Sequence, residues 1–215
     1  MEVILRLEQP SDYRVVEELT REAFWNRHVP GCNEHYLVHV MRSCGAFIGE
    51  LDVVAEINGL IVGNIMYTKA TILGDDGITR EAICFGPISV LPSYWGKGVG
   101  SELIKFTINR AKEMGYPAVL IYGDPDYYKR FGFVPAEKFG IGSSNNMYMD
   151  ALQALELWDG ALRGCKGRFF EDEVYNVDEA EAERFDETFP HKKLSSDLPN
   201  QERFRNLLGL CRPRP

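Results

Sequence analysis

The chain has 215 residues, 45% of them hydrophobic, so it is long enough to bury a substantial core. Its formal net charge of −8 argues against nucleic-acid binding, because phosphate contacts need a basic surface. It has no apolar run of the roughly eighteen residues that a membrane helix needs, and residues 1–12 lack the basic start and apolar core of a signal peptide. We therefore expect a cytoplasmic protein that binds neither nucleic acid nor membrane.

The N-terminal segments predict a strand, two helices and a β-hairpin. Residues 4–7 alternate as a first strand does, and two amphipathic helices follow, the second at residues 34–42. Residues 51–57 and 60–69 are two β-rich runs joined by Asn58-Gly59, which is the strongest short hairpin signal. The order of elements at this end is therefore β-α-α-β-β.

The cysteines do not predict a disulfide framework, because the five of them are odd in number and scattered. Cys32, His35 and His39 have the spacing of metal ligands at a helix start. A structural zinc site normally closes with four ligands, and no obvious fourth lies nearby in the sequence. We expect no bound metal.

Residues 85–115 are typical of a strand that leads through a glycine-rich loop into a long helix. In the stretch Gly96-Lys97-Gly98-Val99-Gly100, the glycines leave backbone N–H groups uncovered and free to adopt positive φ. From Ser101 apolar residues recur at helical spacing, and the first turn of that helix presents unpaired N–H groups and a positive dipole end. This pattern predicts a pyrophosphate site.

Two other glycine-rich loops fit this stretch poorly. A P-loop needs Gly-Lys followed by Ser or Thr, but Lys97 is followed by Gly98. A dinucleotide-binding loop needs Gly-x-Gly-x-x-Gly in an early βαβ unit, whereas the spacing here is Gly-x-Gly-x-Gly in the middle of the chain. We therefore rank a nucleotide-binding regulator third among the possible functions.

Two motifs resemble the GNAT superfamily of N-acyltransferases. LPSYWGKGVGSELI, residues 91–104, is similar to its acyl-CoA loop, Gln/Arg-x-x-Gly-x-Gly/Ala, with Trp95 where the Gln or Arg usually is. AVLIYGDPDYYKRFGF, residues 118–133, is similar to its strand, short helix and Tyr-x-x-x-Gly-Phe, which aligns Tyr128 with the family's acid tyrosine. The resemblance covers nearly the whole chain and is strongest to a bacterial-type subfamily of uncharacterised acetyltransferases.

This resemblance implies an α/β (α+β) fold. A mixed, mostly antiparallel central sheet would be flanked by helices and splayed between its fourth and fifth strands. Residues 1–147 would form the acetyltransferase core. Residues 148–215 would form a C-terminal extension of the same compact domain, with strands at residues 148–158 and 168–177 and two helices. The extension could also complete a homodimer.

The resemblance also implies the reaction, which is acetyl transfer from acetyl-CoA to the primary amine of a small molecule by direct attack in a ternary complex. Strand backbone and glycine loop would bind the cosubstrate, and Tyr128 would also protonate the departing thiolate. The residues expected to bind acetyl-CoA are Ile88, Ser89, Val90, Gly96, Lys97, Gly98, Val99, Gly100, Ser101 and Tyr128.

The general base is less clearly indicated. Members of the family often carry a glutamate on the strand before the glycine loop, but Cys84 occupies about that position here. Glu81, at the start of the strand, is the expected catalytic base, with Asp126, Glu50 or a water bonded to a backbone carbonyl as alternatives. The missing glutamate also favours an alternative function, a non-catalytic acyl-CoA-binding or regulatory module, against which the retained Tyr128 counts.

Overall fold

The computed structural model describes residues 2–215, and the chain separates into two compact units. The fold is mixed α/β, with a mostly antiparallel sheet flanked by helices, and the predicted fold class is confirmed. Strands β3 (Leu60–Gly74) and β4 (Thr79–Val90) contribute residues to both units. The first unit contains Met1–Tyr67, Gly86–Thr107 and Glu173–Arg203, and the second contains Thr68–Phe85, Ile108–Asp172 and Phe204–Pro215.

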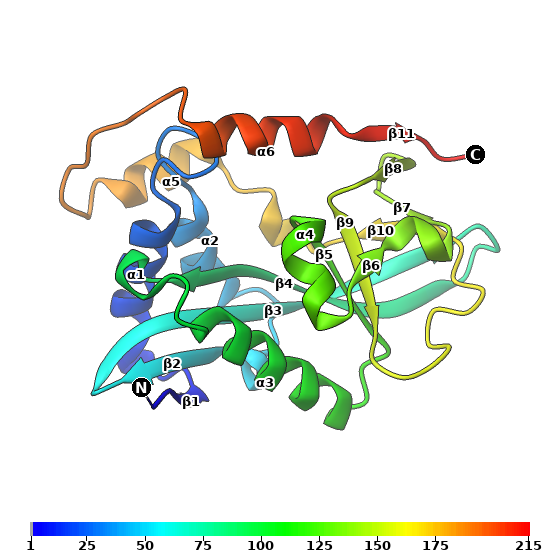
Figure 1. The fold of residues 1–215 in the computed structure, drawn as a ribbon, viewed down its shortest axis with the longest axis horizontal. Coiled ribbons are helices and arrows are strands. Elements are labelled where there is room, and N and C mark those ends of the chain that lie inside the picture. The colour runs from blue at the N-terminus through cyan, green and yellow to red at the C-terminus, as the bar shows by residue number, and fades with distance from the viewer. Residues whose placement is uncertain (1) are drawn as a thin grey trace. The chain divides into compact units, whose positions relative to one another are not determined.

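The first unit has an antiparallel sheet in which β1 (Ile4–Leu7), β2 (Val53–Ile57) and the start of β3 lie side by side (Figure 1). Asn58 and Gly59 join β2 to β3 with φ values of 51° and 78°. Positive φ at both central residues is what a two-residue type I′ turn requires, so the predicted hairpin is confirmed.

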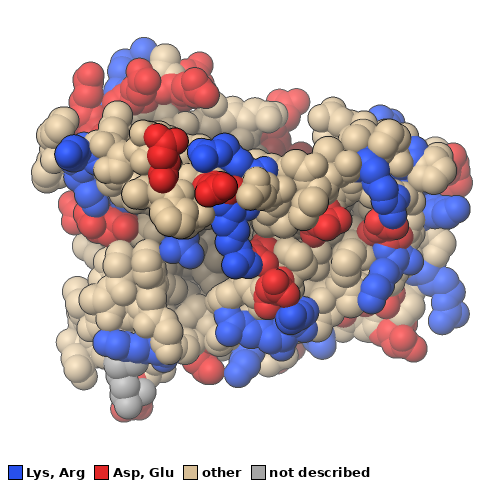
Figure 2. Space-filling view, turned by 45° about the horizontal axis from the view of Figure 1, so that its top comes forward, with Lys and Arg blue, Asp and Glu red and all other residues tan. Residues whose placement is uncertain are grey.

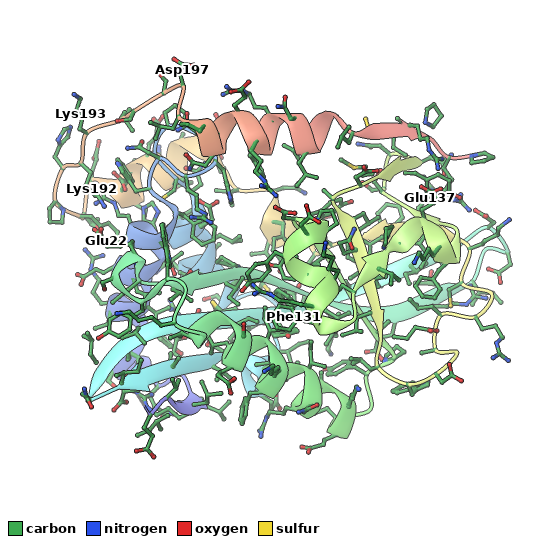
Figure 3. The ribbon with its side chains drawn as sticks, viewed as in Figure 1. Glu22, Phe131, Glu137, Lys192, Lys193 and Asp197 are labelled. Carbon is green, nitrogen blue, oxygen red and sulfur yellow. The ribbon has the colours of Figure 1, made fainter. Side chains whose placement is uncertain are left out.

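Three helices of the first unit pack together, and two of them, α1 and α2, also pack against its strands. They are α1 (Tyr13–Phe24), α2 (Glu34–Met41) and α5 (Glu179–Asp186). The Arg21 guanidinium of α1 donates to both carboxylate oxygens of Asp186 at 2.6 and 2.9 Å. The side chain of Lys192, after α5, donates to Glu22 of α1 at 2.8 Å (Figure 3). Residues 179–192 of the C-terminal extension are therefore held against α1 by ion pairs. The apolar core of the first unit includes contacts of Val16 and Leu19 with Val54 and Ile61. It also includes contacts of Leu37, Val38 and Met41 with Met66.

In the second unit the strand order is β4, β5 (Ala118–Tyr122), β9 (Leu152–Glu156) and β6 (Val134–Pro135). The β4–β5 pair is parallel, with Ile83 opposite Val119, and β4 continues beyond that pair to Val90. The β5–β9 and β6–β9 pairs are antiparallel. Parallel neighbours need a crossover, which α3 (Val99–Glu113) supplies between β4 and β5.

The C-terminal extension adds strands whose limits differ from the prediction. Residues 148–158 do not form one strand, because a turn at Asp150 and Ala151 separates β8 (Met147–Met149) from β9. The strand predicted at residues 168–177 is β10 (Gly167–Phe170), which ends where its register with β3 ends, at Phe170 opposite Thr71. β10 also pairs in parallel with β7 (Ile141–Gly142).

The end of the chain is held on the second unit. β11 (Cys211–Pro213) pairs with β8 in a separate two-stranded sheet (Figure 1). The buried Arg214 donates to the Gly140 carbonyl at 2.8 Å and forms an ion pair with Asp75. The preceding helix is α6 (Pro199–Gly209). Together with α5, it gives the extension two helices.

The surface carries both signs of charge. Figure 2 shows Lys and Arg side chains interspersed with Asp and Glu over the face in view. Among residues 2–215, no helix combines the length and the apolar character needed to cross a bilayer.

Candidate active site

The glycine loop of the first unit has an open backbone. β4 ends at Val90, and α3 begins at Val99. Gly96 and Gly98 have φ values of 73° and 89°, in the left-handed region that favours glycine. A Cβ at either position would meet nothing within 4 Å, so the loop presents bare backbone to a ligand. Gly100 lies inside the first turn of α3, whose first N–H groups have no partner within the helix.

Close packing positions this helix start against the sheet. A Cβ on Gly63 of β3 would come within 3.0 Å of Val99 and Leu103 and within 3.2 Å of the Ser89 carbonyl oxygen. A side chain at this position would require its neighbours to shift, so Gly63 favours the close approach of α3 to β3. Ser89 is buried and its hydroxyl is 3.0 Å from that of Thr20, whereas the neighbours of Ser89 on β4, Ile88 and Val90, are partly exposed.

Trp95 has a role that its position in the motif does not predict. Its indole N–H donates to the Val90 carbonyl oxygen at 2.7 Å, which ties the loop back to the end of β4. The Arg27 guanidinium lies 4.7 Å from the centre of the Trp95 ring, a cation–π arrangement. Trp95 is 48% exposed. It thus braces the loop instead of offering the amide or guanidinium that is usual at this position.

Tyr128 lies in the second unit, at the end of the short helix α4 (Pro125–Tyr128). The Asp124 side chain accepts from the backbone N–H of Asp126 at 2.9 Å, which confirms the predicted N-cap. The Tyr128 ring packs against Phe85 and Phe133, with ring centres 5.8 and 5.7 Å apart. Burial raises the pKa of the Tyr128 phenol above its ordinary value, and nearby Tyr127 and Cys84 add to the shift. The phenol is therefore protonated at neutral pH, as a proton donor must be.

Aromatic residues surround Tyr128 on its own segment as well. Tyr127 is its neighbour at a ring distance of 5.0 Å, and Phe131, on the next turn, packs on Tyr127 at 5.7 Å (Figure 3). Gly123 leaves room for the Tyr128 ring, because a Cβ there would overlap it. Tyr128 is consequently held in place by packing from several sides.

The three carboxyls predicted as base candidates are all exposed. Glu81 lies at the start of β4, Glu50 lies in the 3₁₀ turn before β2, and Asp126 bonds to Lys129 at 2.8 Å. Cys84, in contrast, is buried, and its thiol donates to a carboxylate oxygen of Glu171 at 3.4 Å. The sequence predicts a strand through Glu171 and carries no motif that marks this residue as functional.

The Cys32, His35 and His39 cluster turns towards different partners. Cys32 Sγ is 3.5 Å from Nδ1 of His35, but His39 bonds through Nδ1 to Glu17 at 2.9 Å. Burial raises the pKa of the Cys32 thiol, which disfavours the thiolate that binds metal. Within residues 2–215 no group of three or more His, Cys, Asp or Glu side chains has an arrangement that could hold a metal ion.

The chain is similar to a known protein family and to two proteins of Escherichia coli. Residues 49–135 match the family described as "Acetyltransferase (GNAT) domain". The chain is 28% identical over 174 residues to the uncharacterized N-acetyltransferase YhbS of Escherichia coli (strain K12), an alignment that covers 81% of this chain and 99% of YhbS. It is 38% identical over 85 residues to the uncharacterized N-acetyltransferase YjhQ of the same strain, covering 40% of this chain and 46% of YjhQ.

Two solved structures are also similar to this chain. The crystal structure of YhbS from Escherichia coli in complex with CoA has a TM-score of 0.73 at 28% identity, and the match covers 82% of this chain and 93% of that one. A GNAT family acetyltransferase from Brucella melitensis in complex with acetyl-CoA has a TM-score of 0.65 at 24% identity, covering 81% of this chain and 98% of that one. The second match shows a shared fold.

Proposed function

Because the chain is a member of the GNAT acetyltransferases, with its family domain at residues 49–135, we propose that it transfers an acetyl group from acetyl-CoA to the primary amine of a small molecule. The observation that carries the proposal is the bare backbone of the glycine loop, where Gly96 and Gly98 have positive φ and open space around them. The complex of the relative YhbS with CoA supports acetyl-CoA as the cosubstrate. We place the activity in the cytoplasm.

Different backbone groups would bind the pyrophosphate and the pantetheine arm of acetyl-CoA. The backbone N–H groups from Gly96 to Ser101 would hold the pyrophosphate, aided by the positive end of the α3 dipole. Backbone groups of Ile88, Ser89 and Val90 would bind the pantetheine arm. The Val90 carbonyl already accepts the Trp95 indole and keeps one lone pair for a further donor.

The chemistry needs two proton transfers. An alkylammonium has a pKa near 10.4 by analogy with lysine, so the amine must lose a proton before its nitrogen can attack the thioester carbonyl. The departing thiolate belongs to a thiol with a pKa of about 8.5 and gains from protonation as the C–S bond breaks. We assign that proton to the Tyr128 phenol. The acidic net charge of −8 favours a cationic acceptor.

The first test is calorimetric titration with CoA and acetyl-CoA. We expect both to bind the wild-type protein and Gly98→Val to weaken binding about tenfold or more, since a β-branched residue at a φ of 89° distorts the loop. Gly45→Ala is the control, because a Cβ there meets nothing within 4 Å. If neither compound binds the wild type, the proposal is wrong.

Turnover is tested by free-thiol release from acetyl-CoA with a panel of primary amines. Thiol release that depends on the amine supports transfer. Binding without release for every amine would instead indicate the non-catalytic acyl-CoA-binding module.

Gly123→Ala tests the placement of Tyr128. The new methyl group would overlap the Tyr128 ring and force it to turn, so we expect kcat to fall roughly tenfold to hundredfold, the effect of misplacing a reacting group by about 1 Å. Acetyl-CoA affinity should change little. Steady-state kinetics beside Gly45→Ala measures the effect, and an unchanged kcat would show that the position of Tyr128 does not matter.

A further inference from the structure

Glu171 lies next to Cys84, the position on β4 where the GNAT pattern often has a glutamate. The residue directly follows β10, and its Oε1 accepts from the Cys84 thiol at 3.4 Å across 87 residues of sequence. Both residues belong to the second unit. Cys84 is the position at which the GNAT pattern often has glutamate, so a carboxyl of the C-terminal extension contacts the side chain that replaced it.

Packing anchors the end of β10, the strand that Glu171 directly follows. Phe169, two residues earlier on β10, lies opposite Ile72 of β3, is 1% exposed and packs on the Tyr122 ring of β5 at 6.2 Å. Burial raises the pKa of the Tyr122 phenol, and the charges of nearby Glu171 and Cys84 add to the rise. The Glu171 carboxyl therefore follows an anchored strand and contacts Cys84 of β4, whereas the carboxyls of Glu81, Glu50 and Asp126 are exposed.

The same cluster includes the assigned proton donor. The Tyr128 ring packs on Phe85, the residue of β4 that follows Cys84, with ring centres 5.8 Å apart. Glu171 and Tyr128 thus contact two adjacent residues of β4, Cys84 and Phe85, all within the second unit. Direct amine attack needs this pair of groups, one to accept a proton and one to donate a proton.

The surroundings of Glu171 favour a base. Burial raises its pKa, and the hydrogen bond from Cys84 opposes part of that rise. The titratable groups that face it are the Cys84 thiol from β4 and the Tyr122 phenol from β5, whose pKa is itself raised by burial. A carboxylate with a pKa nearer to neutral accepts a proton more readily than an ordinary one.

We propose that Glu171 is the general base that deprotonates the acceptor amine, an inference that rests on the proposed function. Its carboxylate takes one proton from the ammonium group. The amine nitrogen then forms the C–N bond at the thioester carbonyl, the C–S bond breaks, and its electron pair leaves on sulfur, which takes the Tyr128 proton. The second amine proton restores the phenol through solvent and Glu171 releases its proton, so one proton is released for each acetyl group transferred.

The test compares Glu171→Gln with wild type and with Glu173→Gln, an exposed glutamate two residues later that undergoes the same change of charge. We expect Glu171→Gln to lower kcat/KM for an alkylamine by about a hundredfold or more and to abolish the rise of kcat/KM with pH that the base produces. Acetyl-CoA affinity and thermal stability should stay near those of the wild type, and Glu173→Gln should match the wild type throughout.

A series of amines separates catalysis from structure. With amines of pKa below about 7, which arrive neutral, the difference between wild type and Glu171→Gln should shrink towards none. An equal loss for every amine would overturn the assignment. If wild type releases no thiol with any amine, the proposed function fails. If wild type turns over and Glu171→Gln keeps its rate and pH profile, only the role of Glu171 fails.

Cys84→Ala is a second variant that leaves the carboxyl in place. Because the thiol hydrogen bond lowers the pKa of Glu171, its removal should move the rising limb of kcat/KM to higher pH. A limb that stays where it is in Cys84→Ala would contradict the proposal, even if Glu171→Gln does not fold.

Discussion

Tyr128→Phe is expected to lower kcat by roughly 10²–10⁴ with alkylamine acceptors, the usual contribution of a positioned proton donor. The substitution removes the hydroxyl but keeps the ring that packs on Phe85 and Phe133. Acetyl-CoA affinity and stability should therefore change little. Thiol-release kinetics with calorimetry as the binding control measures the result.

Tyr127→Phe is the matched control for this variant. Tyr127 adjoins Tyr128 and packs on Phe131, so the same hydroxyl is removed one residue away. We expect its kcat to stay within about twofold of wild type. A thioester with a more acidic leaving thiol should reduce the Tyr128→Phe defect, because its thiolate needs less help from an acid. Equal turnover of Tyr128→Phe and wild type would remove the phenol from the mechanism.

Arg42→Met is expected to destabilise the protein by about 3–5 kcal/mol, the cost of breaking a buried ion pair by removing one partner. The Arg42 side chain is 5% exposed and donates to Glu8 at 2.8 and 2.9 Å and to Glu17 at 3.0 Å. Without it, buried carboxylates lose their cation. Urea unfolding at pH 7 measures the change, with the exposed Arg184→Met as the control that should lose almost nothing.

The pH dependence of stability checks the same network. Burial raises the pKa of Asp52 to about 9, and a hydrogen bond and charge from Glu8 add to the shift. Because the folded state holds this proton more tightly than the unfolded state, the contribution of Asp52 to stability should fall as pH rises from about 4 towards 9. Asp52→Asn should flatten that fall and recover part of the stability lost in Arg42→Met. If wild type and Asp52→Asn had the same pH dependence of stability, the raised pKa of Asp52 would be contradicted.

The sites that sequence reasoning located depend on short stretches of chain. The hairpin at Asn58-Gly59 and the cap at Asp124 are confirmed because the residues involved are neighbours. The strands of the extension were less predictable. A turn at Asp150 divides β8 from β9, and β10 stops at Phe170, since pairing partners far away in sequence set these limits.

The sequence alone predicts the open glycine loop, because positive φ at Gly96 and Gly98 and the helix start that follows are local properties of the backbone. It also determined Tyr128 as the candidate donor through the motif around it. The folded chain is needed to see that Trp95 braces the loop through the Val90 carbonyl and that Glu171 contacts Cys84. The second contact joins residues 87 positions apart, and no periodicity or spacing in a single chain encodes a pairing that sheet topology creates.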